Sequence, residues 1–324
     1  MNLPWLARLT LVAVLALATT VSSGQSYPSK PIRIIVPFPP GGAVDFYARV
    51  VQEPLSEALG QPVIIDNRAG ASGMIGADVV AKAAPDGYTL LLGNIASLAI
   101  NVGIYPKMAY DPAKDFTPIM HTVDVNYVLV VHPSVPANSV AELIAYAKAN
   151  PGKLSYGSAG SGSMPHLSTE LMKSLAGIDL VHVPYKGGGP MVTDLLGGSV
   201  QLAIADQANL MPHVKTGRLR ALGVASPKRS AIYPELPTIA ESGFAGYEAT
   251  AWQGLVGPAG MSPDVVGRLN QTLAKVMAMP AVRERLIGGG LDPVADTPEE
   301  FGRFIRSEIS KWSKIAKDVG AKAE

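Results

Sequence analysis

The sequence lacks cysteine altogether, which excludes a disulfide framework and also an anchoring lipid attached to a cysteine. It also lacks any run of basic residues. Of the 27 lysines and arginines, Arg8 lies in the N-terminal segment, and the 26 that remain balance 26 acidic residues. Proteins that bind nucleic acid or anionic membrane surfaces concentrate positive charge. The composition therefore predicts neither nucleic acid nor a membrane surface as a partner.

The motifs of several enzyme and cofactor classes are missing. There is no G-x-x-x-x-G-K-[ST] nucleotide loop, and the turn "GSAGSGS" (157–163) fails the G-x-G-x-x-G pattern because Pro165 occupies its last position. The same turn lacks the G-x-S-x-G elbow of serine hydrolases, since alanine stands at its centre. We expect no cofactor, no metal and no enzymatic activity. The histidines show no metal-binding spacing; they are His121, His132, His166, His182 and His213.

An apolar run near the N-terminus, "LTLVAVLALATTV" (9–21), has 13 residues. This is shorter than the roughly 20 residues that span a bilayer. Arg8 precedes the run and small residues, "SSGQS", follow it. We therefore predict that residues 1–25 are a secretory signal cleaved near Gly24 or Gln25. An uncleaved anchor helix is the alternative interpretation.

Short apolar runs alternate with helical patterns along the rest of the chain, which is typical of the α/β class. Ser139 and Glu142 predict a capping box for a helix that Pro151 stops, and Thr297 with Glu300 predicts the start of the last helix. Continuous apolar runs suit strands that are buried on both faces of a parallel sheet. The candidate strands are 32–36, 63–65, 89–92, 128–131, 154–156, 200–205 and 221–225.

One strand–turn–helix pattern occurs twice, in "VPFPPGGAVD" (36–45) and again at 153–177. The helices are expected to begin near Ala43 and near Ser163, the second with Pro165 in its first turn. A helix N-terminus leaves backbone N–H groups unpaired and carries partial positive charge, and glycine leaves these groups accessible. Either turn alone could be a simple tight connection. Two of them, in two α/β domains facing one cleft, predict an anion site.

Two acidic residues near these turns have two interpretations each. Asp45 either caps the helix that begins near Ala43, or accepts a hydrogen bond from a ligand amine, a ligand hydroxyl or a bridging water. Asp206 ends another candidate strand, where it either reaches the cleft or serves as a turn or cap residue. The sequence leaves both choices open.

Several stretches taken together resemble one family. They are "YPSKPIRIIVPFPPGGAVD", "VIIDNRAGASGMIGADVVAKAAPDGYTLLL", "LSYGSAGSGSMPHL", "VPYKGGGPMVTDLLGGSVQLAIA", "GRLRALGVASPKR" and "LPTIAESGFAGYEATAWQGLVGPAGMSP". Their order over nearly all of the chain is similar to that of the solute receptors of tripartite tricarboxylate transporters, the Bug family.

The resemblance implies a two-domain type 2 periplasmic-binding-protein (Venus flytrap) fold with a hinge between two α/β sheet domains. Domain 1 would comprise residues 27–126 and 251–324, and domain 2 residues 127–250. The carboxylate-gripping loops of the family correspond to residues 38–45 and 157–163. Ser97 and Gln207 are further candidates for the wall of the cleft, whereas Tyr185 and Lys186 could equally be structural. The implied ligand-binding residues are Phe38, Pro40, Gly41, Gly42, Asp45, Asn94, Ser158, Ala159, Gly160, Ser161, Gly162, Tyr185 and Asp206.

The function implied by the resemblance is that of a periplasmic receptor. It would capture a small carboxylate, which could be an organic acid, an acidic amino acid or an aromatic acid, and deliver it to a two-subunit membrane permease. We expect a monomer. A ligand-binding co-sensor for a two-component signalling system is the alternative. A hydrolase using Ser158, Ser161 or Ser163 is not favoured, because the sequence shows no base and no nucleophile elbow for these serines.

Overall fold

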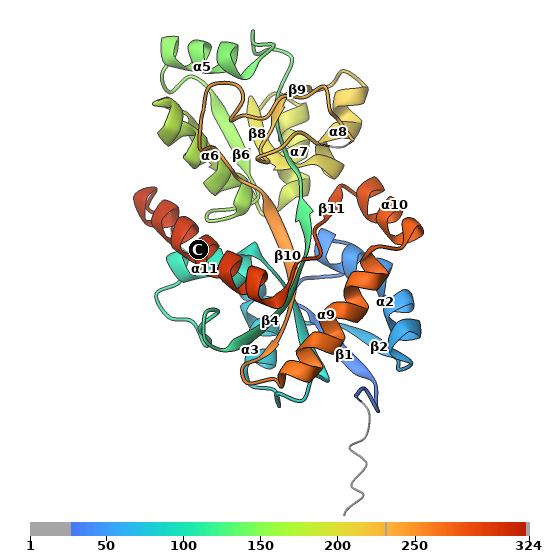
Figure 1. Ribbon diagram of the computed structural model, residues 1–324. Coiled ribbons are helices and arrows are strands. Elements are labelled where there is room, and N and C mark those ends of the chain that lie inside the picture. The colour runs from blue at the N-terminus through green and yellow to red at the C-terminus, as the bar shows by residue number, and fades with distance from the viewer. Residues whose placement is uncertain (1–26, 231, 322–324) are drawn as a thin grey trace, which may run out of the picture.

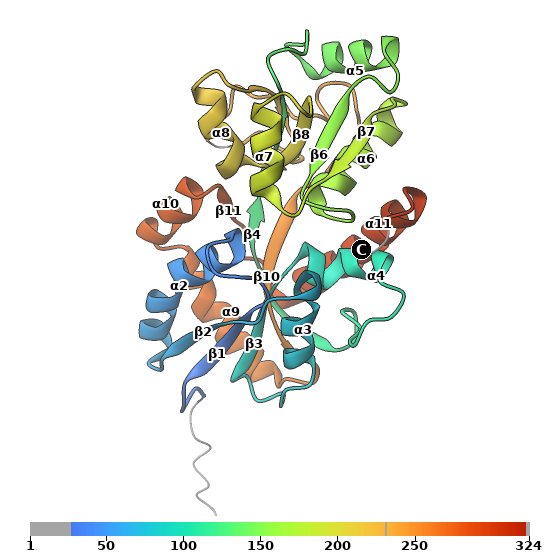
Figure 2. The same cartoon turned by 180° about the vertical axis from the view of Figure 1, so that it is seen from behind.

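The computed structural model describes residues 27–230 and 232–321. The predicted signal, residues 1–25, lies outside the described residues. Two separate sheets, each covered by helices, form the lower and upper halves of the molecule in Figure 1. This is the two-domain α/β flytrap architecture that the sequence predicted, and Figure 2 shows the same two halves from behind. No helix in the described residues is both long enough and apolar enough to cross a membrane.

The first sheet has six strands in the order β11–β4–β10–β3–β1–β2. Its strands are β1 (Ile32–Val36), β2 (Val63–Asn67), β3 (Thr89–Asn94), β4 (Phe116–Val125), β10 (Ala251–Pro258) and β11 (Leu291–Pro293). The helical elements of this half are α2 (Ala43–Leu59), η1 (Ala71–Gly73), α3 (Met74–Ala81), η2 (Ala96–Ile100), α4 (Asn101–Ile104), α9 (Pro263–Met277), α10 (Pro280–Gly288) and α11 (Pro298–Asp318).

The second sheet has five strands in the order β7–β6–β8–β5–β9. Its strands are β5 (Tyr127–Val131), β6 (Ser155–Ser158), β7 (Val181–Pro184), β8 (Leu202–Asp206) and β9 (Arg220–Val224). Four helices accompany it in the described residues: α5 (Val140–Ala149), α6 (Met164–Ala176), α7 (Gly188–Leu196) and α8 (Gln207–Lys215).

The chain passes between the two sheets at two places. The first is Asn126, which separates β4 from β5, and the second is the segment between β9 and β10. Asn126 is tied to both halves: its side-chain Nδ2 donates to Asp292 Oδ2 at 2.6 Å, and its carbonyl accepts from the Gln207 N–H at 2.8 Å. All strands of the first sheet lie within 27–126 or 251–324. The domain boundaries, residue by residue, stay a prediction.

Opposite faces of β10 contact different helices. Trp252 donates from its indole N–H to Glu308 on α11 at 2.9 Å, and a Cβ on Gly254 would collide with Phe301 of the same helix. Leu255, one residue further along, faces the other side and lines a small internal cavity together with Tyr47 of α2. This alternation follows from the two-residue period of a strand, so Gln253 also faces the side of α2.

The prediction of parallel sheets was wrong for part of each sheet. β1 pairs in parallel with β2 and β3, and β6 with β7 and β8. In contrast, β10 is antiparallel to β3 and β4, β11 is antiparallel to β4, and β5 is antiparallel to β8 and β9. The strands that lead from one half to the other therefore make both sheets mixed. Four strands were not predicted: β4, β7, β10 and β11.

The predicted helix starts are confirmed, with one difference in detail. Thr297 and Glu300 form a complete capping box at the start of α11. At α5, Ser139 Oγ accepts from the Glu142 N–H at 3.1 Å, but the Glu142 carboxylate accepts from Asn138 rather than from Ser139. The box predicted there is therefore only half formed, because Glu142 reaches one residue further back along the chain.

Candidate functional site

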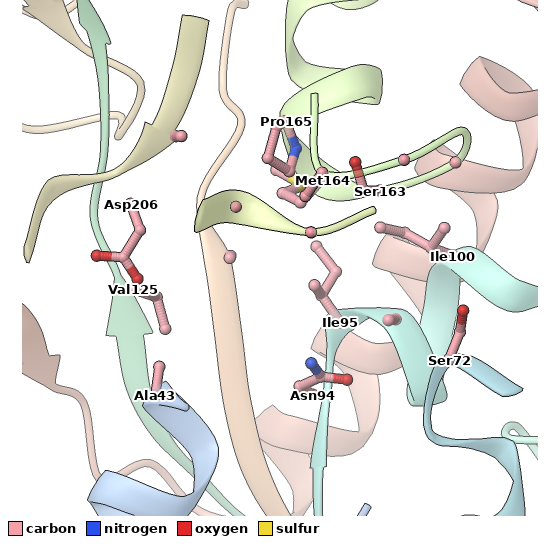
Figure 3. A pocket seen from close by; sticks show the side chains of 18 of the residues that line it. Ala43, Ser72, Asn94, Ile95, Ile100, Val125, Ser163, Met164, Pro165 and Asp206 are labelled. Carbon is pink, nitrogen blue, oxygen red and sulfur yellow. The ribbon is translucent and has the colours of Figure 1, made fainter. Parts of the chain in front are cut away.

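A cavity of about 590 Å³ lies between the two sheets, and residues from both halves line it. Figure 3 shows side chains entering it from both sides, with Asn94 and Ser72 below and Ser163 and Met164 above. Eight of the residues predicted to bind the ligand line this cavity, and five do not. Those that line it are Phe38, Asn94, Ala159, Gly160, Ser161, Gly162, Tyr185 and Asp206. Those outside its lining are Pro40, Gly41, Gly42, Asp45 and Ser158.

The loop at residues 159–163 forms one end of the cavity. It follows β6 and leads into α6, whose N-cap residue is Ser163. The first bond of this helix runs from the Leu167 N–H to the Ser163 carbonyl, so the N–H groups of Met164 and His166 lie outside the helix's own hydrogen bonds. Ser163 makes no side-chain cap, and its buried Oγ has no hydrogen-bond partner in the part of the chain that the structure describes. The loop thus presents polar groups to the cavity.

Glycine is required twice in this loop. Gly160 has φ +125° and Gly162 has φ +75°, values that side-chain-bearing residues rarely adopt. The two N–H groups are used inside the protein, which differs from the expectation that they grip the ligand. Gly160 N–H donates to Ser158 Oγ at 3.2 Å, and Gly162 N–H donates to His166 Nδ1 at 2.9 Å. These bonds hold the shape of the loop.

Two stacked histidines make hydrogen bonds with Gly162 in the loop and with Ser158 just before it. The rings of His166 and His182 lie 4.0 Å apart with an interplanar angle of 6°. His182 Nε2 is 2.7 Å from Ser158 Oγ. Burial lowers the pKa of His166; Lys173 adds to this effect and Glu170 opposes it. A neutral His166 is the form that can accept the Gly162 N–H at Nδ1.

The expectation that no base accompanies the serines was therefore wrong for Ser158. β6 and β7 pair in parallel with Tyr156 opposite His182, which brings His182 beside Ser158 although 24 residues separate them. Ser158 is nevertheless fully buried, does not line the cavity, and also hydrogen-bonds the backbone of Gly160. The pair stabilises the loop and has no access to a substrate in the cavity.

The predicted loop at residues 38–45 contributes fewer residues to the cavity lining than expected. Phe38 lines it, as do Ala43 and Val44 at the start of α2. Asp45 is buried, and its carboxylate accepts from the Gly41 N–H at 3.0 Å, from Asn67 Nδ2 at 3.0 Å and from Arg49 Nε at 2.8 Å. Burial opposes the charged form, but these hydrogen bonds outweigh it and lower the pKa of Asp45. The carboxylate of Asp45 thus holds the loop at Gly41, and a ligand contact by Asp45 stays a prediction.

The wall residues have internal partners as well as cavity contacts. Tyr185 donates its hydroxyl to Asp194 Oδ2 at 2.8 Å, and burial together with Asp194 raises the pKa of Tyr185 to about 12. Asp206 is the N-cap of α8 and accepts from the Ala208 N–H at 2.8 Å. Figure 3 shows its carboxylate beside Val125. Burial raises the pKa of Asp206.

Charge is scarce on the cavity wall. Among the described residues, Lys186 and Asp206 are the charged ones that line it, and neither arginine nor histidine does. Most of the remaining wall is apolar; it includes Ile95, Ile100, Ile104, Tyr105, Val125, Tyr127, Met164, Met191 and Trp252. Among the described residues no group of three or more histidine, aspartate or glutamate side chains could hold a metal ion. The cavity suits a ligand with an apolar body and few charges.

Sequence reasoning missed several wall residues, and Gln253 is one of the polar ones, with Ser72, Asn101 and Asn209. Gln253 lies on β10, which was not predicted as a strand. The signal that could have found it is a single amide within the otherwise apolar run "AWQGLVGP". Lys186, whose role the sequence left open, lines the cavity, whereas the expected wall residues Ser97 and Gln207 are buried and do not.

Comparison with known proteins places the chain among solute receptors. The sequence pattern of the tripartite tricarboxylate transporter family receptor matches residues 47–321 of this chain. Protein BugT of Bordetella pertussis is 40% identical over 312 residues, which are 96% of this chain and 95% of BugT. The structure of R. palustris Rpa4515 with adipate superposes with a TM-score of 0.80 at 40% identity, covering 92% of this chain and 100% of the other. MatC (Rpa3494) from Rhodopseudomonas palustris with bound malate gives a TM-score of 0.75 at 32% identity, covering 89% and 99%.

Proposed function

The chain belongs to the tripartite tricarboxylate transporter receptor family, a family of solute receptors and not of enzymes, and on that premise we propose that it captures a small carboxylate in the cavity between its two sheets. It then delivers this ligand to a two-subunit membrane permease. One observation carries the proposal. The N-terminus of α6 opens on the cavity with a buried serine hydroxyl, that of Ser163, which has no partner among the described residues.

The carboxylate is held at the 159–163 loop. The N–H groups of the first turn of α6 and its partial positive charge stabilise an anion there. Ser163 Oγ adds a donor, and Lys186 adds positive charge on the wall of the same half. Lys186 follows Tyr185, whose N–H donates to the Ser158 carbonyl at 3.0 Å, so the lysine lies next to this loop. The remainder of the ligand packs on the apolar wall.

Adipate and malate, which similar structures contain, support this choice of ligand class. Both are small carboxylates with short carbon chains. The volume of about 590 Å³ also accommodates larger acids with an aromatic or aliphatic body.

Closure of the two halves is the signal to the permease. A ligand that contacts both halves at once shifts the equilibrium toward the closed form, because it gains contacts that the open form cannot make. The two crossings, at Asn126 and between β9 and β10, serve as the hinge. We take residues 27–126 with 251–324 as one moving unit and 127–250 as the other.

The cell location and the oligomeric state belong to the same proposal. The protein works in the periplasm, reaches it by means of the signal at residues 1–25, and acts there as a monomer.

A thermal-shift screen followed by small-angle scattering tests the proposal. Ligands that bind only the folded form raise the melting temperature by mass action. The screen covers citrate, succinate, malate, adipate, glutamate, nicotinate, benzoate and terephthalate. The proposal predicts a shift from at least one acid, and a smaller radius of gyration when that acid is saturating. An acid that binds without any change in the radius of gyration would contradict the closure step.

A further inference from the structure

The side-chain amide of Gln253 is buried without a hydrogen bond. The residue is 1% exposed, it lines the cavity, and neither Nε2 nor Oε1 finds a partner in the described part of the chain. A buried polar group left unpaired costs about 1–3 kcal/mol in general, so such groups normally have partners. Gln253 has both an unpaired donor, Nε2, and an unpaired acceptor, Oε1, among the described residues.

The strand alternation places this amide on the side of the first sheet where α2 begins, whereas Trp252, which also lines the cavity, faces α11. Trp252 and Gly254 face α11, so Gln253 faces the opposite side, where α2 begins. Ala43 and Val44, the first two residues of α2, line the same cavity. Gln253 thus lies at the floor of the cavity, on the half opposite the 159–163 loop.

Asn94 stands next to Gln253. The two residues are register partners on antiparallel strands β3 and β10, so their side chains lie on the same face of the sheet. Asn94 Oδ1 accepts from Ser97 N–H at 3.1 Å and from Ser97 Oγ at 3.2 Å. No partner for Asn94 Nδ2 occurs within residues 27–230 and 232–321. Figure 3 shows the Asn94 amide entering the cavity from the end of β3.

We propose that Gln253 and Asn94 together recognise a neutral group of the ligand that both donates and accepts hydrogen bonds, namely a hydroxyl or a carboxamide. The proposal rests on the carboxylate-receptor function above and specifies its ligand. One end of the ligand is a carboxylate at the 159–163 loop, and the hydroxyl or carboxamide contacts the floor of the cavity.

The donor and acceptor inventory favours a neutral group over a second carboxylate. Gln253 offers two N–H donors and one carbonyl acceptor, and Asn94 Nδ2 offers further donors. A carboxylate only accepts, so it would leave Gln253 Oε1 buried and unpaired. A methyl group would leave every one of these groups unpaired. A hydroxyl or a carboxamide satisfies donors and acceptor together, and sites of this kind discriminate strongly against analogues that lack the group.

Isothermal titration calorimetry with matched ligand pairs tests the inference. The pairs are malate against succinate, adipamate against adipate, and 4-carbamoylbenzoate against terephthalate; each differs by one hydroxyl or by one amide in place of a carboxylate. We expect the hydroxyl or amide member of at least one pair to bind about tenfold or more tightly to the wild-type protein. In Gln253→Leu the ratio of the two dissociation constants within that pair should fall below about threefold.

Gln207→Leu is the matched control. Gln207 is equally buried, and its Nε2 also has no partner among the described residues, but it does not line the cavity. This variant should keep the wild-type ratio. Because leucine replaces an unpaired amide in Gln253→Leu, its melting temperature should equal or exceed that of the wild type, which separates lost recognition from lost folding.

Three results decide the question. The inference is supported if the ratio of dissociation constants falls in Gln253→Leu but keeps its wild-type value in Gln207→Leu. Equal or tighter binding of succinate, adipate and terephthalate than of their hydroxyl or amide partners, or a ratio of dissociation constants unchanged in Gln253→Leu, overturns the inference and leaves the carboxylate-receptor function standing. Failure of every acid in all three pairs to bind the folded wild-type protein overturns the receptor function as well.

Discussion

Gly162, in the loop that precedes α6, lies directly against Ile104 at the end of α4, so that the two halves of the molecule touch at the edge of the cavity. A Cβ on Gly162 would collide with Ile104 Cδ1. Both residues line the cavity. The absence of a side chain at position 162 therefore leaves the space that Ile104 Cδ1 occupies against the loop.

Gly162→Ala should weaken ligand binding, because the new methyl group takes the space of Ile104 Cδ1 and the Ile104 side chain, which lines the cavity, must shift. The positive φ adds about 1–2 kcal/mol of backbone strain. Gly177→Ala is the matched control: Gly177 ends the same helix with φ +61° and has open space around it. Gly177→Ala should lower the free energy of unfolding, measured by urea denaturation, about as much as Gly162→Ala does, but it should bind the ligand with wild-type affinity. Equal affinities of the two variants would contradict the role of this contact.

The serines at the N-cap positions of α5 and α6 should respond differently to alanine. Ser139 Oγ accepts from the Glu142 N–H, whereas Ser163 Oγ has no partner in the described residues. Ser139→Ala should lower the free energy of unfolding by about 0.5–2 kcal/mol without changing affinity. Ser163→Ala should leave unfolding almost unchanged and weaken carboxylate binding several-fold. Urea titration and calorimetry on the two variants measure both effects, and unchanged affinity in Ser163→Ala would remove the serine from the site.

His166 should make stability depend on pH between neutral and mildly acidic conditions. Its pKa in the native state is lowered from the ordinary 6.5, chiefly by burial. The unfolded chain therefore binds a proton first as the pH falls, and stability that is complete above about 6.5 is lost progressively toward the lower native pKa. Affinity should fall as well, because a protonated His166 cannot accept the Gly162 N–H.

His166→Asn provides the comparison, since the amide oxygen can accept the same N–H but does not titrate. The change in urea midpoint and in affinity between pH 8 and pH 5.5 should be smaller in this variant than in the wild type. Identical pH profiles would show that other groups govern the dependence.

Asp45 and Arg49 should contribute unequally to stability. Asp45→Asn disturbs a buried carboxylate that accepts three hydrogen bonds, and should cost about 1–3 kcal/mol. Arg49→Gln should cost less than Asp45→Asn, because the arginine side chain is 52% exposed and solvent screens its ion pair. Because the native pKa of Asp45 is lowered, its contribution is present above the ordinary value of 3.8 and disappears as the pH falls through the native pKa. Urea denaturation of both variants measures whether Asp45→Asn loses more unfolding free energy than Arg49→Gln.

The sequence predicted those parts of the structure that depend on local pattern. The strand runs at 32–36 and 89–92 are continuous and apolar because helices or neighbouring strands cover both faces, and the N-cap at Ser163 follows from residue type and spacing. The 159–163 loop was found for the same reason. Gln253 was not found, because its role depends on the antiparallel pairing of β10 with β3 across 159 positions of sequence.

Long-range register also explains the errors. Ser158 and His182 lie on neighbouring strands, and their 2.7 Å contact cannot be read from either segment alone. The role of Asp45, which the sequence left open, depends on a contact of the same kind, because its environment includes Asn67 at the end of β2. Residue type placed Asp45 near the site, but only the pairing of β1 with β2 shows that its carboxylate is fully engaged.

The most direct test of the central claim compares acids with their neutral amides by isothermal titration calorimetry. The protein is titrated with adipate, adipamate and benzoate, and then with adipamide and benzamide, which carry no carboxylate. The account predicts binding of at least one acid with one molecule per protein and no measurable binding of its neutral counterpart. Binding of a neutral amide as tight as that of the acid, or no binding by any acid to the folded protein, would contradict a cavity built for a carboxylate.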